Sequence, residues 1–173
     1  MSSSTGFFLS FLTLSATSAI ASHPYRYYLK SNNGYYLSSS MTYNGHINYV
    51  LLAGESLAQP LNLYTGDGSI TVETSNVIGA SSQAPLLLSD NAGISETYKQ
   101  VILGEQKSGT YTKDFSFADD GGLGLKKDGF HGFVACTASK DVKQLYWATV
   151  DGDVPVCCEK VSFTRQWYLN KTA

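Results

Sequence analysis

Short segments with apolar residues at alternate positions run from residue 27 to residue 164, and this alternation limits what the chain can fold into. Successive side chains of a β-strand point to opposite faces of a sheet, so a period of two indicates strands with one buried face. Gly, Asn, Ser and Asp separate the segments, as is typical of β-turns. The sequence therefore predicts an all-β fold. The segments are YYLK, YYLS, YVLL, LNLY, ITVE, LLLS, VILG, FSFA, LGLK, FVAC, LYWA and VSFT.

The segments form three groups of four, which cover residues 27–64, 70–118 and 123–164. Equivalent segments of the first and third groups are 96 to 100 residues apart, so each group corresponds to a unit of about 50 residues. This repeat predicts a β-trefoil of three units, in which strands close a barrel and hairpins cap it. The alternative is a β-sandwich, whose short strands follow one another at similar intervals.

The beginning of the chain predicts a signal peptide over residues 1–21. An apolar run is followed by small residues, and Ala19-Ile20-Ala21 fits the cleavage rule of signal peptidase, with the cut before Ser22. A membrane span is the competing interpretation, but it needs about 20 strongly apolar residues, and hydroxyl residues such as Thr13 and Ser15 interrupt this stretch. We therefore expect a single all-β domain over residues 22–173, secreted to the extracellular space or the cell wall.

Charge and composition argue against two classes of partner. The net charge is −2 and only 15% of residues are charged, with no lysine-rich face, so nucleic acid is not expected as a partner. No later apolar run is long enough to predict a membrane span.

The chain has three cysteines, two of them adjacent: Cys136, Cys157 and Cys158. In an oxidising compartment a disulfide is the default for cysteines that can meet. A bond between the adjacent pair would close a strained ring, so the better bond joins Cys136 to one member of the pair. Adjacent side chains of a strand face opposite ways, so only one of the two can readily face Cys136.

Three stretches resemble a family of small secreted fungal proteins of unknown function: GFVAC (132–136), QLYW (144–147) and PVCCEKVSF (155–163). The family's first strand also resembles YYLK at 27–30, and the likeness is specific over 121–163. A looser likeness exists to fungal cell-wall proteins described as IgE-binding, which have proline where this chain has Thr137. The resemblance implies a Cys136–Cys158 bond with Cys157 left over, and it implies no activity.

The residues suited to acid–base chemistry form no recognisable catalytic set. The chain has no G-x-S-x-G motif, and the aspartate pairs lie in Gly-rich turns, where turn formation explains them. We therefore predict no catalytic residue, no metal site and no cofactor. The residues considered are His23, His46, His131, Asp119–Asp120 and the pair Asp151 and Asp153.

Tyrosine is unusually frequent, with 12 residues, and exposed tyrosines beside Asn and Asp suit sugar rings. We expect a secreted, non-enzymatic fungal protein that acts at the cell wall or a host surface by binding polysaccharide. The alternatives are an effector that binds a host protein, a protease inhibitor of trefoil type and a small hydrolase. Asn170 lies in a glycosylation sequon. The candidate binding residues are Tyr36, Tyr43, His46, Tyr111, Asp120 and Tyr146.

If the chain is secreted by signal-peptide cleavage, the protein recovered from culture fluid begins at Ser22 or within a residue or two of it. N-terminal sequencing checks this directly. Recovery of the protein from the cytosol with Met1 retained would contradict it.

Overall fold

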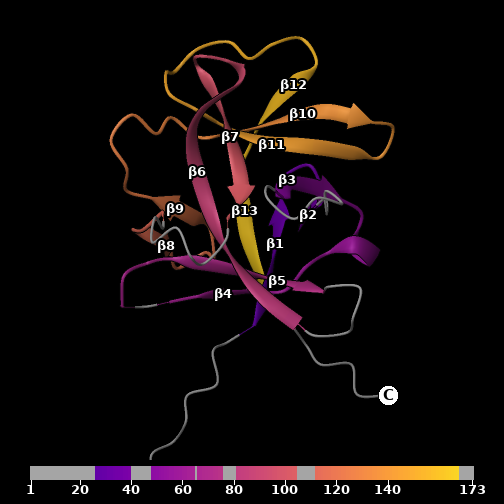
Figure 1. The fold of residues 1–173 in the computed structure, drawn as a ribbon, viewed down its shortest axis with the longest axis vertical. Helices are drawn as coiled ribbons and strands as arrows, with labels where there is room; N and C mark the ends of the chain where they lie inside the picture. Colours follow the sequence, from indigo (N-terminus) through magenta and orange to yellow (C-terminus); the bar gives the residue numbers. More distant parts are fainter. Residues whose placement is uncertain (1–25, 40–47, 65, 76–80, 105–111, 168–173) are drawn as a thin grey trace, which may run out of the picture.

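The fold is described from a computed structural model, which places residues 26–39, 48–64, 66–75, 81–104 and 112–167. These residues form antiparallel strands and, as their helical element, one short 3-10 turn (Figure 1). The elements are β1 (Tyr27–Ser31), β2 (Tyr36–Ser39), β3 (Asn48–Ala53), η1 (Glu55–Leu57), β4 (Leu61–Leu63), β5 (Ile70–Ser75), β6 (Ser81–Ser95), β7 (Tyr98–Leu103), β8 (Phe115–Phe117), β9 (Leu123–Leu125), β10 (Phe133–Ser139), β11 (Val142–Ala148), β12 (Cys158–Val161) and β13 (Phe163–Trp167).

Each of the alternating segments lies in a strand or across a strand boundary, so the all-β prediction is confirmed. In β1 the side chains alternate between buried and half-buried, as a period of two requires. The last segment, VSFT, is divided at Ser162, where β12 ends and β13 begins after it.

Eight strands form a closed antiparallel ring in the order β11-β3-β2-β1-β4-β5-β6-β7, and β7 pairs with β11 to complete it. Strand β10 extends the sheet from β11, β12 pairs with β10, and β13 lies beside β1. Strands β8 and β9 form a separate hairpin. The long strand β6 runs along the molecule from β7 to β5 (Figure 1). The result is a barrel-like sandwich.

The predicted β-trefoil of three equivalent units is wrong. The first group of segments supplies four strands to the ring, β1 to β4, the middle group supplies β5 to β7, and the third group supplies only β11. Alternation finds strands but not their partners, which long-range packing selects. Two local features distinguish the groups. β6 extends over 15 residues, of which the first part, to Pro85, pairs with β5 and the part from Leu86 pairs with β7. The VSFT segment is divided between β12, which pairs with β10, and β13, which pairs with β1. The sandwich alternative is nearer to the observed fold.

The core fills the inside of the ring and reaches the β8–β9 hairpin. Its largest fully buried side chains lie between Leu29 and Phe163, and burial of each stabilises the fold by about 1.5–3 kcal/mol. Edge-to-face aromatic contacts join distant strands: the rings of Phe133 and Phe163 are 5.4 Å apart, and those of Tyr27 and Phe117 are 5.0 Å apart. Burial raises the pKa of the Tyr27 hydroxyl.

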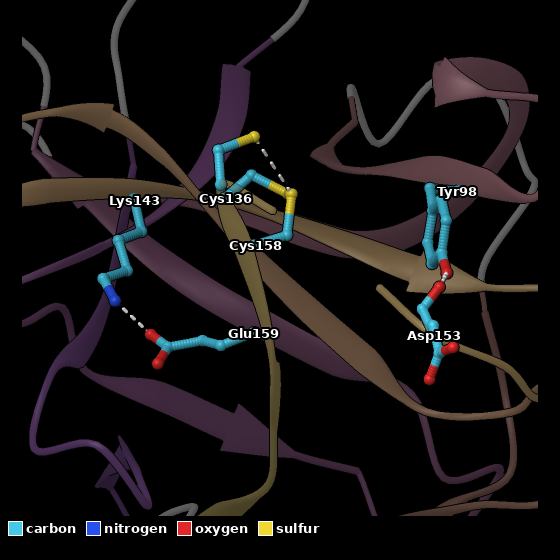
Figure 2. Close-up of a disulfide and its surroundings, with 7 residues drawn as sticks. Tyr98, Cys136, Lys143, Asp153, Cys158 and Glu159 are labelled. Atoms are coloured by element: carbon cyan, nitrogen blue, oxygen red, sulfur yellow. Dashed lines mark hydrogen bonds and ion pairs between the residues drawn. A yellow bond between two sulfur atoms is a disulfide. The ribbon is translucent and has the colours of Figure 1, made fainter. Parts of the chain in front are cut away.

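A disulfide joins Cys136 to Cys158, which are direct cross-strand neighbours on β10 and β12. The pairing that the resemblance implied is therefore confirmed. Cys157 lies in the turn just before β12, is exposed, and keeps a free thiol 3.6 Å from the sulfur of Cys158. Figure 2 shows the disulfide and, beside it, an ion pair in which Lys143 on β11 contacts Glu159 on β12 across β10. Covalent and ionic contacts thus fix β12 to the β10–β11 hairpin.

In the part of the chain that the structure describes, no helix has the length and the apolar character that crossing a bilayer would require.

Replacing both Cys136 and Cys158 by Ser should lower the free energy of unfolding by about 3 kcal/mol, because the bond closes a loop with a sequence separation of 22. That loss corresponds to a fall in the melting temperature of about 10 °C, which thermal denaturation followed by circular dichroism measures. Cys157→Ser is the matched control and should leave the melting temperature unchanged. An equal loss in the control would contradict the assignment of the free thiol.

Candidate functional site

Four of the residues predicted from sequence to bind or carry glycan lie outside the described residues, as does the predicted signal peptide: Tyr43, His46, Tyr111 and Asn170. The other three, Tyr36, Asp120 and Tyr146, lie on β2, in the β8–β9 turn and on β11. None of these three lines the hollows described below.

Tyr36 was expected among the exposed tyrosines, but only 9% of its surface is accessible. Its neighbours Leu37 and Ser38 are buried as well, so β2 is covered on both faces and parity cannot select an outward position there. The ring of Tyr36 packs edge-to-face on Tyr28, and the Lys30 ammonium lies 5.4 Å from its centre. Tyr36 is therefore a packing residue.

Asp120 and Tyr146 also have structural roles. Asp120 is exposed, and its Oδ1 accepts a hydrogen bond from the backbone N–H of Gly122 at 2.8 Å, which shapes the β8–β9 turn. Tyr146 is half-buried against Gly93, where an added Cβ would lie 2.6 Å from the Tyr146 ring. Burial raises the pKa of Tyr146. The six predicted binding residues therefore do not form one described site.

Two adjoining hollows, of about 500 and 580 Å³, form a shallow groove on the surface instead. Asp114 and Lys126 line both hollows, so the hollows adjoin at these two residues, and each has the volume of an ordinary ligand site. We call this surface the Asp114 groove. Its polar and aromatic lining residues are Tyr64, Asp67, Asp90, Thr112, Lys113, Asp114, Ser116, Phe117, Lys126, Lys127 and Asp128.

The β4–β5 turn and the chain entering β8 build the middle of the groove. Gly68 has a φ of +67°, which turns the chain and allows close contact with β8. The Asp114 N–H donates to the Asp67 carbonyl at 3.1 Å, and the Phe115 N–H donates to the Gly68 carbonyl at 3.0 Å. Asp114 itself has a φ of 65°, which is unusual for a residue with a side chain. These backbone bonds hold Asp114 in that conformation and fix its place in the groove.

The carboxylate of Asp67 is held in one orientation. Its Oδ1 accepts hydrogen bonds from the Ser69 hydroxyl at 2.7 Å and from the Ser69 N–H at 3.0 Å. These two hydrogen bonds lower the pKa of Asp67, and the nearby Lys113 ammonium lowers it further by a smaller amount. Oδ2 has only a loose contact with Lys113, at 4.0 Å. Asp67 therefore offers a charged, oriented acceptor to a molecule in the groove.

Tyr64 supplies the aromatic surface of the groove and is 44% exposed. Its hydroxyl donates a hydrogen bond to Gln83 Oε1 at 3.0 Å, which limits movement of the ring. Sequence reasoning did not single out Tyr64, although it directly precedes the turn-forming stretch TGDGS. An exposed ring next to oriented carboxylates and ammonium groups can bind a molecule that has both apolar faces and hydroxyls.

The described residues do not form a catalytic or metal-binding set. No group of three or more His, Cys, Asp or Glu side chains within the described ranges is placed to hold a metal ion. His131 and Ser162 line the same hollow, but no described hydrogen bond joins them. Asp151, the acid near His131, forms an ion pair with Lys160 at 2.9 Å. The geometry of a nucleophile, a base and an orienting acid is therefore not present among them.

The profile of one protein family matches residues 16–167, and that family is described as "Domain of unknown function (DUF7907)". No curated protein and no solved structure is significantly similar to the chain. The match confirms that the sequence resembles an uncharacterised family.

Gly68→Ala should destabilise the protein by roughly 2 kcal/mol, because φ is positive there and the new Cβ would lie 2.8 Å from Asp114 N and Phe115 O. Gly54→Ala is the control, since its φ is −61° and a Cβ there meets nothing within 4 Å. Urea denaturation of the two variants measures the difference. Equal stability of both variants would show that the β4–β5 turn does not pack on β8 in this way.

Proposed function

The chain belongs to the DUF7907 family, and we propose that this member is a non-enzymatic protein that binds neutral glycans in the Asp114 groove. The exposed ring of Tyr64 beside the oriented Asp67 carboxylate carries the proposal. The flat face of a tyrosine ring covers the apolar side of a sugar, and carboxylate oxygens accept hydrogen bonds from its hydroxyls.

The charges of the groove favour an uncharged polysaccharide. Its lining contains four aspartates and three lysines, so neither sign dominates. A strongly acidic or basic polymer would be repelled by one set or the other, whereas sugar hydroxyls can donate to the carboxylates and accept from the ammonium groups. The four aspartates are Asp67, Asp90, Asp114 and Asp128, and the lysines are Lys113, Lys126 and Lys127.

An extracellular location would bring the protein into contact with polysaccharides, and two features favour that location. The signal-like stretch before Ser22 and the Cys136–Cys158 disulfide both fit an oxidising extracellular compartment. With the fungal origin that the sequence resemblance implies, the proposed ligands are polysaccharides of the cell wall or of a host surface. An effector that binds a host protein is the remaining alternative without an enzymatic step. A protease inhibitor of trefoil type is no longer an alternative, because the fold is not a trefoil.

Tyr64→Ala should weaken retention of the protein on its polysaccharide roughly tenfold, because stacking of one ring contributes about 1 kcal/mol or slightly more. Retention is measured on a panel of insoluble chitin, β-glucan, mannan and plant polysaccharides. Tyr64→Phe is the matched control: it removes the hydrogen bond to Gln83 but keeps the ring, so most of the affinity should remain.

Two results would contradict the proposal. The first is that no polysaccharide on the panel retains the unmodified protein. The second is that Tyr64→Ala and Leu57→Ala, a change at an exposed residue outside the groove lining, bind equally well. Unchanged melting temperatures show that each variant is folded.

A further inference from the structure

A smaller hollow of about 270 Å³ lies between the beginning of β10 and the loop of residues 149–157, and we call it the loop pocket. It shares no lining residue with the Asp114 groove. At about 30 Å³ for each water, its volume corresponds to roughly nine waters, which is close to the size of a small organic molecule with one ring.

The floor of the loop pocket is apolar. Val134 from β10 and Ala148 from β11 line it, and both are buried. They form one cluster with Tyr98 and the loop residue Val154, on the face of β10 that is opposite to Phe133. Water in such a space has few hydrogen-bond partners on the floor side, so an apolar group would displace it favourably. The floor therefore suits a hydrocarbon body.

The rim of the loop pocket is rich in hydrogen-bond donors. Lys160 Nζ donates to Asp151 Oδ1 at 2.9 Å, which leaves two of its three N–H bonds. Asn32 also lines the pocket; its Oδ1 accepts from the Ser162 N–H, so its amide nitrogen is left as a donor. The His131 ring lines the same rim and makes no hydrogen bond among the described residues.

No carboxylate lines the loop pocket, although Asp151 and Asp153 lie in the same loop. Asp151 is directed to Lys160, and its pKa is lowered by that contact, so it remains a partner of the ammonium. Lys160 is the one charged side chain among the residues that line the pocket, and Asp151 and Asp153 act on it from the loop. Its two remaining N–H bonds and the Asn32 amide point to a ligand with an anionic acceptor at the rim.

The loop that closes the pocket is held at several points, so the pocket exists before a ligand arrives. The Tyr98 hydroxyl donates to the Asp153 carbonyl at 2.7 Å, as Figure 2 shows. The Thr149 N–H donates to the Thr97 carbonyl at 2.9 Å, and the disulfide to Cys158 secures the end of the loop. A preformed site binds without the entropy cost of ordering the loop.

We propose that the loop pocket binds a small monocarboxylate whose body is a single aromatic ring or a branched hydrocarbon of similar size. The carboxylate lies at the rim, where Lys160, Asn32 and His131 can donate to it, and the body lies on Val134 and Ala148. This inference does not depend on glycan binding, because the two sites are separate.

The test is isothermal titration calorimetry, in which sodium phenylacetate is titrated into the full-length mature protein. Saturable binding with a Kd below about 1 mM is expected for a ligand of this size in a preformed pocket. The neutral analogue 2-phenylethanol should bind at least tenfold more weakly, since it lacks the charge that the rim selects.

Lys160→Met keeps the aliphatic stem and removes the ammonium, so it should weaken phenylacetate binding about tenfold. Lys140→Met is the matched control, because Lys140 is an exposed lysine outside the pocket lining, and it should bind as the unmodified protein does. Gly152→Leu is a second variant that should weaken binding by filling part of the pocket, because Gly152 lines it and a Cβ there meets nothing within 4 Å, so the fold accepts the side chain.

Either of two results would overturn the proposal: no saturable binding of phenylacetate up to 10 mM, or equal Kd values for Lys160→Met and Lys140→Met. Equal affinity for phenylacetate and 2-phenylethanol would overturn the assignment of an anionic ligand. Glycan retention through the Asp114 groove should be unaffected by phenylacetate, so the two proposals fail independently.

Discussion

The pairing of β7 with β11 is the contact on which the rest of the structure depends. Together with the shorter pairing of β7 with β3, it closes the eight-strand ring, and closure removes the free edges that an open sheet would expose. It also sets the register that places Tyr98 opposite Ala148, so that Thr97 meets Thr149 and the Tyr98 hydroxyl reaches the Asp153 carbonyl. The same ladder therefore encloses the core and positions the loop pocket.

The Asp114 groove and the loop pocket are formed in the same way: hydrogen bonds from a loop to a neighbouring strand fix the loop's polar groups. In the Asp114 groove, bonds between the β4–β5 turn and β8 hold Asp114 at its positive φ. In the loop pocket, bonds from Tyr98 and Thr149 hold the segment before β12. Their chemistry differs: the groove mixes acids and bases around an exposed ring, whereas the pocket places N–H donors above buried hydrocarbon.

Sequence reasoning located the strands well, because alternation is a local property that burial of one face imposes. It could not supply the pairing: the extension of β6 and the division at Ser162 depend on which distant strands are available. The disulfide partner came from the family resemblance. Tyr36 was assigned to the wrong side because β2 is covered on both faces, and Tyr64 was missed because its exposure depends on how the β4–β5 turn packs on β8.

The ladder between β1 and β13 has a kinetic consequence. Tyr27 pairs with Trp167 and Ser31 with Phe163, so the first described strand cannot complete its contacts until the last one is present. Contacts between such distant parts of a chain form only after the loop between them has closed, and closure costs conformational entropy before the contacts stabilise the fold. Proteins dominated by such contacts fold over milliseconds to seconds. During that interval part of the hydrogen-bonding edge of β1 is open to other chains, so the nascent protein is most prone to aggregate before β13 docks.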